Sequence, residues 1–344
     1  MRPGIASVPL PTVELEVRSA FDFLVAACSD CGELDELLPE DRRWLVESRK
    51  RFVAKLAGNA CIEVCSGMVF EVSRMLVDRY DITLARHVVD LVDSMPDSEL
   101  TEWIMGELLD DPEVGALTRR ALDGDRAAFV ELQGRLDAMK GHQILDGELA
   151  DIAPAMRQIL HWWLPLYEAI EPRVARMLER DVAAWRREEV GRDPFAFVEK
   201  ATNGLRMVNE QRTRRILLVP TYFGRPYNSM TRVGDVQVIC YPIADSSLGS
   251  ADRLAPPSST LRLYRALGDE SRLRILKLLA EHDRYLTEIS NELELRKPTV
   301  SHHLAALRSA GLVTVTAQGN MTYYSLRRDR VEEAGIELRS FLAR

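Results

Sequence analysis

The sequence of 344 residues lacks the features that mark secreted and membrane-spanning chains. Its five cysteines are an odd number spread thinly, which argues against the disulfide framework of a small secreted domain. No stretch approaches the roughly 18 consecutive apolar residues of a membrane helix, and the first residues lack the basic and then apolar order of a secretion signal. We therefore expect a cytoplasmic protein with reduced thiols and no membrane partner.

Catalytic motifs are also missing. The chain has no glycine loop of the kind that cradles phosphates, no HExxH pair and no G-x-S-x-G elbow. These absences predict that the protein is not an enzyme and requires no cofactor.

The net charge of -8 is unevenly distributed along the chain. Residues 258–344 hold 14 Lys and Arg against 11 Asp and Glu, whereas residues 1–257 hold 31 against 42. Attraction to DNA depends on the local patch rather than on the total charge. The distribution therefore suits a mildly basic C-terminal module behind an acidic body.

The pattern of apolar residues predicts a mainly α fold with minor β (α+β). Residues 1–204 form a helical domain, because apolar residues recur three and four positions apart. Residues 205–243 contain two β-rich runs, Arg215–Pro220 and Val236–Tyr241, which we interpret as a β-hairpin attached to that domain. Residues 244–260, rich in Ser and Pro, are a predicted linker, and residues 261–344 form the C-terminal module.

The C-terminal module has the order helix, helix, helix, β-wing, helix. Asp269 is an N-cap for the first clear helix, and Pro298 fits the first turn of the third helix, which Gly311 ends. Two segments in which apolar and polar residues alternate surround Ala317-Gln318-Gly319-Asn320, whose residue types favour the turn of a β-hairpin. This arrangement is a winged helix-turn-helix.

The outer face of the helix after Pro298 is small and polar. Val300, Leu304 and Leu307 fall on one side, whereas Ser301 and His302 fall elsewhere. Small residues let a helix enter the major groove, and hydroxyl and imidazole groups can bind base edges or phosphates. We therefore expect double-stranded DNA as a partner of this helix.

The segments LGDESRLRILKLL, KPTVSHHLAALRSAGLV and QGNMTYYSL resemble the ArsR family of winged helix-turn-helix regulators over about residues 258–344. The resemblance implies a homodimer packed through the first and last helices of the module, which reads an inverted-repeat operator and usually represses transcription. It also implies DNA-facing roles for particular residues. These are Lys297, Thr299, Ser301 and His302 on the helix, with Gln318 and Asn320 at the wing tip. We add Arg296 and Arg308 as phosphate contacts.

Metal sensing, which many family members perform, is not expected here. The segment Arg284–Ile289, which matches the position of a cysteine pair in metal-sensing relatives, has no thiol. The final predicted helix, Asp329–Leu342, has no histidine to complete a nitrogen and oxygen site.

Residues before the module offer two further candidate sites. Cys28, Cys31, Cys61 and Cys65 have spacings at which thiolates could hold a zinc ion or act as a redox switch, although cysteine is also a common core residue. His161, Trp162, Trp163 and Tyr167 lie on a helical stretch that could line an effector pocket, and aromatic residues at this spacing are also typical of a core.

These observations predict a one-component transcriptional repressor whose helical domain senses a non-metal signal, such as a small-molecule effector, or binds a partner. Two alternatives stay open at the level of sequence. The helical domain could be an uncharacterised enzyme fused to the regulator, or the whole chain could be a dimeric protein-interaction scaffold.

Overall fold

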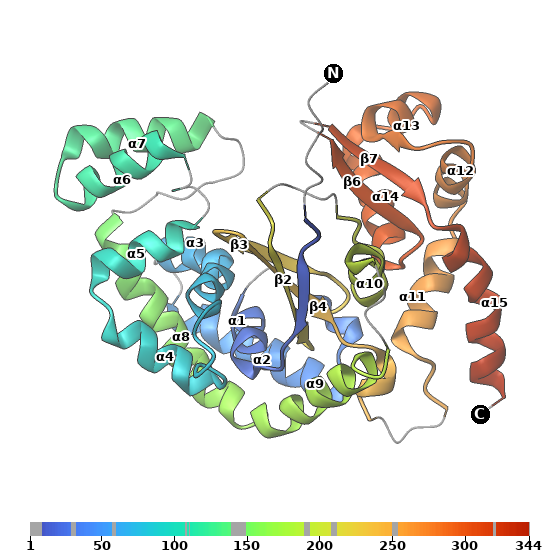
Figure 1. Cartoon of the computed structure of the whole chain (residues 1–344), viewed down its shortest axis with the longest axis horizontal. Coiled ribbons are helices and arrows are strands. Elements are labelled where there is room, and N and C mark those ends of the chain that lie inside the picture. The colour runs from blue at the N-terminus through green and yellow to red at the C-terminus, as the bar shows by residue number, and fades with distance from the viewer. Residues whose placement is uncertain are drawn as a thin grey trace. The chain divides into compact units, whose positions relative to one another are not determined.

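The computed structural model describes residues 9–28, 32–56, 60–106, 109, 111–138, 149–188, 193–207, 212–249, 254–318 and 321–343. The chain, shown in Figure 1, divides into two compact units. The body unit contains Glu14–Ala183 and Arg215–Ile243, and the C-terminal unit contains Met1–Val13, Ala184–Arg214 and Ala244–Arg344. Helices predominate, with two small sheets, so the predicted fold class of mainly α with minor β is confirmed.

The body unit is built around a four-stranded sheet of order β1-β2-β4-β3. The strands of this sheet are β1 (Thr12–Leu15), β2 (Arg215–Thr221), β3 (Ser229–Val233) and β4 (Val236–Pro242), and the first two residues of β1 are grouped with the C-terminal unit. Strand β2 pairs with β4 in parallel, from Arg215 opposite Val236 to Thr221 opposite Pro242, and β3 pairs with β4 in antiparallel orientation. The hairpin predicted from β2 and β4 is therefore wrong.

The physical reason lies in the segment between the two predicted strands. Residues 229–233 form β3, which occupies one edge of β4 and leaves the other edge for β2. From the second residue of β2 onward, and through the first six residues of β4, the strands are buried. Burial on both faces is typical of parallel strands that are covered by helices.

Helices cover the sheet and make up the rest of the body unit. Helix α1 packs on β2, and α4 and α8 pack on α1. Pro39 and Pro112 each lie in a first helical turn, where the missing N–H costs no hydrogen bond. The helices are α1 (Ser19–Ala27), α2 (Pro39–Leu56), α3 (Ala60–Met68), α4 (Ala85–Ser94), α5 (Asp97–Met105), α6 (Pro112–Leu122), α7 (Arg126–Ala138), α8 (Ile152–Glu168) and α9 (Glu171–Trp185), with 3-10 turns at Leu34–Glu36, Val69–Leu76 and Leu149–Asp151.

A buried carboxylate fixes the turn that follows β2. Oδ1 of Asp22 on α1 accepts hydrogen bonds from the backbone N–H of Tyr222 at 2.6 Å and of Phe223 at 3.0 Å. Oδ2 accepts from the Tyr167 hydroxyl at 2.9 Å. Burial raises the pKa of Asp22 to about 6, although these donors act in the opposite direction. The carboxylate thus ties α1, α8 and the end of β2 together.

The C-terminal unit contains six helices and a three-stranded sheet of order β5-β7-β6 among its described residues. The helices are α10 (Pro194–Ala201), α11 (Ser258–Leu267), α12 (Glu270–Leu279), α13 (Leu286–Glu292), α14 (Lys297–Ser309) and α15 (Arg328–Leu342). The strands are β5 (Arg284–Tyr285), β6 (Val313–Gln318) and β7 (Met321–Leu326). Helices α11 and α15 lie side by side (Figure 1).

The limits of this unit differ from the expected domains. Residues 184–214 were expected in the helical domain and at the start of the β region, yet they cluster with the winged module. The predicted linker 244–260 also contains local structure, because Asp245–Ser247 form a 3-10 turn and Asp245 accepts hydrogen bonds from Ser259 N and Oγ at 2.8 and 2.7 Å. Tertiary packing of this kind leaves no local pattern in the sequence.

The part of the chain that the structure describes contains no helix with both the length and the apolar character needed to cross a membrane.

Candidate nucleic-acid interface

Two helix caps set the positions of the helices that support the interface. The side chain of Asp269 accepts a hydrogen bond from the backbone N–H of Arg272 at 2.9 Å and so begins α12. The guanidinium of Arg272 contacts the end of α11, where it donates to the carbonyl oxygen of Ala266 at 2.8 Å. At α13, Oε2 of Glu288 accepts from the backbone N–H of Tyr285 at 3.0 Å.

The turn between α13 and α14 is tight. Glu294 has a φ of 56°, and the Ser290 hydroxyl donates to the carbonyl oxygen of Leu295 at 2.6 Å. Helix α14 then begins at Lys297, with Pro298 in its first turn. The predicted helix Pro298–Gly311 is thus present with slightly shifted ends.

The inner side of α14 is apolar and anchors the helix to its neighbours. Val300, Leu304 and Leu307 are buried, as predicted, and α14 packs on α11, α12, α13 and β6. They belong to a cluster of fourteen buried residues. Those residues are Leu263, Ala266, Ile275, Leu276, Leu279, Ile289, Leu293, Val300, Leu304, Leu307, Ala310, Leu312, Val313 and Ala334.

The outer side of α14 is exposed and carries the residues that the sequence singled out. All six predicted residues of the helix and the turn before it are exposed, and the set holds three cations, two hydroxyls and one imidazole. They are Arg296, Lys297, Thr299, Ser301, His302 and Arg308. Gln318 ends β6, and Asn320 lies outside the described residues. The helical candidates are therefore all accessible to solvent, and three of them are cations.

The wing is a short antiparallel ribbon beside α14. Strand β6 pairs with β7 from Val313 opposite Leu326 to Gln318 opposite Met321. The β5 residue Tyr285 lies opposite Tyr323 of β7, with ring centroids 6.2 Å apart. The third strand thus attaches the wing to the start of α13.

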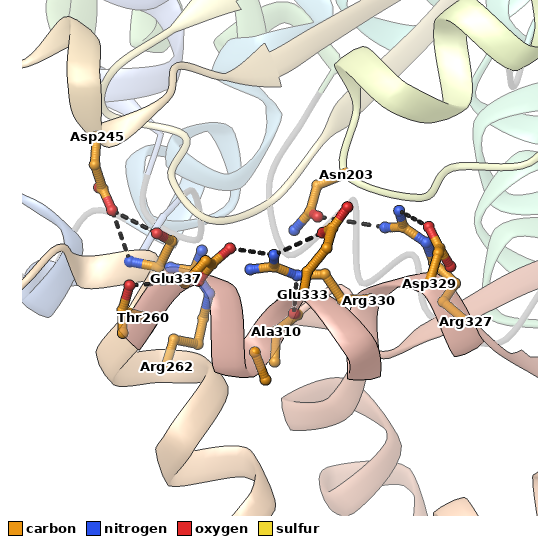
Figure 2. A network of polar contacts seen from close by, with 12 residues as sticks. Asn203, Asp245, Thr260, Arg262, Ala310, Arg327, Asp329, Arg330, Glu333 and Glu337 are labelled. Carbon is orange, nitrogen blue, oxygen red and sulfur yellow. Dashed lines mark hydrogen bonds and ion pairs between the residues drawn. The ribbon is translucent and has the colours of Figure 1, made fainter. Parts of the chain in front are cut away.

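A polar network joins α15 to the end of α14 (Figure 2). The buried guanidinium of Arg330 donates to Glu333 at 3.1 Å and to Glu337, and its Nε donates to the carbonyl oxygen of Ala310 at 3.5 Å. On α11, the Thr260 hydroxyl donates to Oε2 of Glu337 at 3.3 Å. Helices α11, α14 and α15 are thereby held at one point.

Sequence reasoning missed these network residues. Arg330 has acidic residues three and seven positions later, which a helix places on one face, so the spacing was a usable signal. The sequence around Arg262 gives no such signal, although its Nε donates to the carbonyl oxygen of Ser309 at 2.8 Å.

The candidate cysteine site is not assembled by the described thiols. Sγ of Cys61 lies 3.8 Å from Sγ of Cys65, and the Cys28 thiol donates to the carbonyl oxygen of Gly67 at 3.7 Å. Within the described residues no three His, Cys, Asp or Glu side chains are grouped to hold a metal ion, and Cys31 lies outside them. Burial raises the pKa of both Cys61 and Cys65, which disfavours the thiolate form.

The four candidate effector-pocket residues on α8 have different surroundings. Trp163 and Tyr167 are buried, and Trp163 contacts the rings of Trp44, Phe52 and Trp162. His161 is exposed, with its Nε2 2.9 Å from Oδ2 of Asp93. Trp163 and Tyr167 therefore serve the aromatic core of the body unit.

Three supporting helices, an exposed basic helix and a β-wing define a winged helix-turn-helix DNA-binding module. Residues 269–315 match the family model described as bacterial regulatory protein, arsR family. An uncharacterized HTH-type transcriptional regulator of Methanocaldococcus jannaschii is 43% identical over 72 residues, which cover 21% of this chain and 81% of that protein. The chain belongs to the arsR family and is a DNA-binding transcriptional regulator.

Other relatives match the same small share of the chain. The transcriptional activator HlyU of Vibrio cholerae is 38% identical over 76 residues, 22% of this chain and 69% of that protein. The solved structure of HlyU from Vibrio cholerae N16961 is 29% identical, covers 25% of this chain and 94% of that chain, and gives a TM-score of 0.21. These matches leave about three quarters of the chain without a counterpart.

Proposed function

We propose that the protein is a homodimeric transcriptional repressor that reads an inverted-repeat operator through α14. The observation that carries the proposal is the exposure of all six predicted contact residues on this helix and its preceding turn. Arg296 and Lys297 bind phosphates at the helix start, whereas Ser301 and His302 face base edges. The surface combines positive charge with donors and acceptors, as sequence-specific DNA binding requires.

The dimer is supported by an unpartnered apolar stripe on α15. Val331, Leu338 and Leu342 are 41%, 36% and 73% exposed and follow one another at seven and then four positions, which places them on one helix face. Leu261 and Tyr264 on the adjacent α11 are also exposed. A second copy of the same surface would bury these side chains in an isologous interface.

The signal is proposed to be something other than a metal ion. Where metal-sensing relatives carry a cysteine pair, this chain has Arg284, whose guanidinium is 9% exposed. It donates to the carbonyl oxygen of Leu278 at 3.4 Å and to Glu281 at 3.1 Å, and it lies 3.6 Å from Glu292. At this position the chain thus has an ion-paired guanidinium in place of thiolate ligands. The body unit is the proposed receiver of a small-molecule effector or protein partner.

Selection from a random duplex library tests the proposal. The full-length protein is expected to enrich one inverted repeat, and a reporter behind that sequence is expected to be repressed when the protein is present. Binding to every duplex alike would contradict operator recognition. Activation of the reporter would contradict repression while leaving operator recognition intact. The relative HlyU is named as an activator, so the reporter measurement is needed.

A further inference from the structure

A turn from outside the family-matched residues packs on the joint between α14 and the wing. Residues 202–205 follow α10 and belong to the C-terminal unit, whereas the family model matches residues 269–315. Thr202 closes the turn: its hydroxyl donates to the carbonyl oxygen of Val198 at 2.6 Å, and its oxygen accepts from the backbone N–H of Leu205 at 3.2 Å. The turn is therefore formed by its own hydrogen bonds as well as by its contact with the module.

Asn203 packs against Gly311, which follows the C-terminal end of α14. It has a φ of 56°, in the left-handed region that Asn adopts more readily than most residues. Gly311 has a φ of 72°, and a Cβ atom at Gly311 would lie only 2.5 Å from Oδ1 of Asn203. The amide of Asn203 thus occupies the space that a side chain at position 311 would need.

The same turn contacts strand β6 of the wing and the residue that follows β7. The guanidinium of Arg327, the residue after β7, donates to Oδ1 of Asn203 at 3.4 Å, as Figure 2 shows, and also pairs with Asp329 at 3.1 Å. Leu205 forms a parallel bridge with Val315 of β6. Because β6 is an edge strand of the sheet, Leu205 covers backbone groups that would otherwise face solvent.

We propose that Asn203 is a positioning residue for DNA recognition, which holds the wing at a fixed angle to α14. The residue contacts the end of the helix through Gly311 and the end of the wing through Arg327, so it restricts relative movement of these two elements. The inference rests on the proposed function, because a fixed angle is useful only if helix and wing engage one operator together. Asn203 itself does not touch DNA.

Full-length Asn203→Gly tests the inference, because glycine keeps the left-handed backbone and removes only the side chain. The probe is the duplex that the wild-type protein selects from a random library, with an unrelated duplex as reference. We expect the ratio of the two affinities to fall about tenfold, as for a residue that couples two structural elements. Hydrogen exchange of the wing amides in 313–318 and 321–326 is expected to become faster.

Two controls separate positioning from general stability. Asn203→Asp keeps an acceptor oxygen for Arg327 and is expected to retain the wild-type affinity ratio. Lys200→Gln changes an exposed residue of α10 whose ion pair is with Glu188, so the ratio and the exchange rates should stay as in the wild type. If Asn203→Gly left the ratio and wing exchange unchanged while the wild type still selected an operator, the positioning role would be wrong. If the wild type selected no sequence, the proposed function itself would fail.

Discussion

Nδ1 of His303 lies 3.8 Å from Oδ1 of Asp269, the residue that caps α12, while the adjacent His302 is exposed. The side chain of His303 is 14% exposed. Two neighbouring histidines on one helix therefore have different surroundings. His303 packs α14 against the cap of α12, and His302 is available to a ligand.

Separate alanine substitutions of the two histidines are expected to give opposite results. His302→Ala should weaken binding to the selected duplex about tenfold and leave the unfolding temperature unchanged, because a base contact accounts for roughly 1–3 kcal/mol of discrimination. His303→Ala should lower the free energy of unfolding by about 1 kcal/mol, a common loss for a packed side chain. Fluorescence anisotropy and chemical denaturation measure the two effects. Weaker DNA binding in His303→Ala together with lower stability in His302→Ala would contradict both assigned roles.

Lys297→Ala is expected to flatten the salt dependence of DNA binding. Each phosphate that a cation neutralises contributes about 0.9 to the slope of log K against log salt, so the slope should decrease in magnitude by about 1. The matched control is Lys200→Ala, which removes the same charge from α10. An equal loss of slope in both variants would show that only the total charge matters.

The stability of the body unit is expected to depend on the ionisation of Asp22. Its pKa is raised from 3.8 to about 6 in the folded protein, so the folded state binds the proton more tightly than the unfolded state. The free energy of unfolding should therefore fall as the pH rises from about 4 to about 6. Asp22→Asn keeps an acceptor for Tyr222 and Phe223 and should remove this fall. Urea denaturation across the pH range provides the measurement, and an unaltered pH profile in the variant would assign the effect to another group.

Leu338→Glu is expected to dissociate the proposed dimer. The charge would be placed in the middle of the apolar stripe, where a partner would have to desolvate it. Ser340→Glu is the control, because Ser340 is exposed on the opposite side of α15. Sedimentation equilibrium should give a monomer for the first variant and a dimer for the second. Dimers in both cases would place the interface elsewhere.

Gly311→Ala is expected to destabilise the C-terminal unit by about 1–3 kcal/mol, because alanine is strained at positive φ and its Cβ would collide with Asn203. Part of the loss should be recovered when Asn203→Gly is added, since that change removes the collision but not the backbone strain. Thermal unfolding of the wild type, the two single variants and the double variant completes a double-mutant cycle. Strict additivity would contradict the contact between the two residues.

The winged module could be predicted because its signals are local. Asp269, Pro298 and Gly311 mark helix ends whatever surrounds them, and the spacing of Val300, Leu304 and Leu307 identifies the buried side of α14. The remaining positions of α14 then form its exposed face. Buried polar partners are different: nothing near Arg262 in the sequence indicates that it reaches the carbonyl oxygen of Ser309.

The pairing of β2 with β4 could not be predicted for a related reason. Both are short apolar runs separated by a turn-rich segment, which is also the pattern of a hairpin. Only the third strand between them, Ser229–Val233, decides the direction of pairing, and its residues carry a weak strand signal. The packing of residues 184–214 with the winged module is likewise a long-range contact.

The division of the chain has a consequence for how the protein can be dissected. The backbone passes between the two units four times, at residues 13–14, 183–184, 214–215 and 243–244. No single cleavage releases either unit whole. A shortened protein that begins after residue 243 would therefore bind DNA without the turn 202–205, which contacts the wing. Any signal received by the body unit has four covalent connections along which to reach the operator-binding surface.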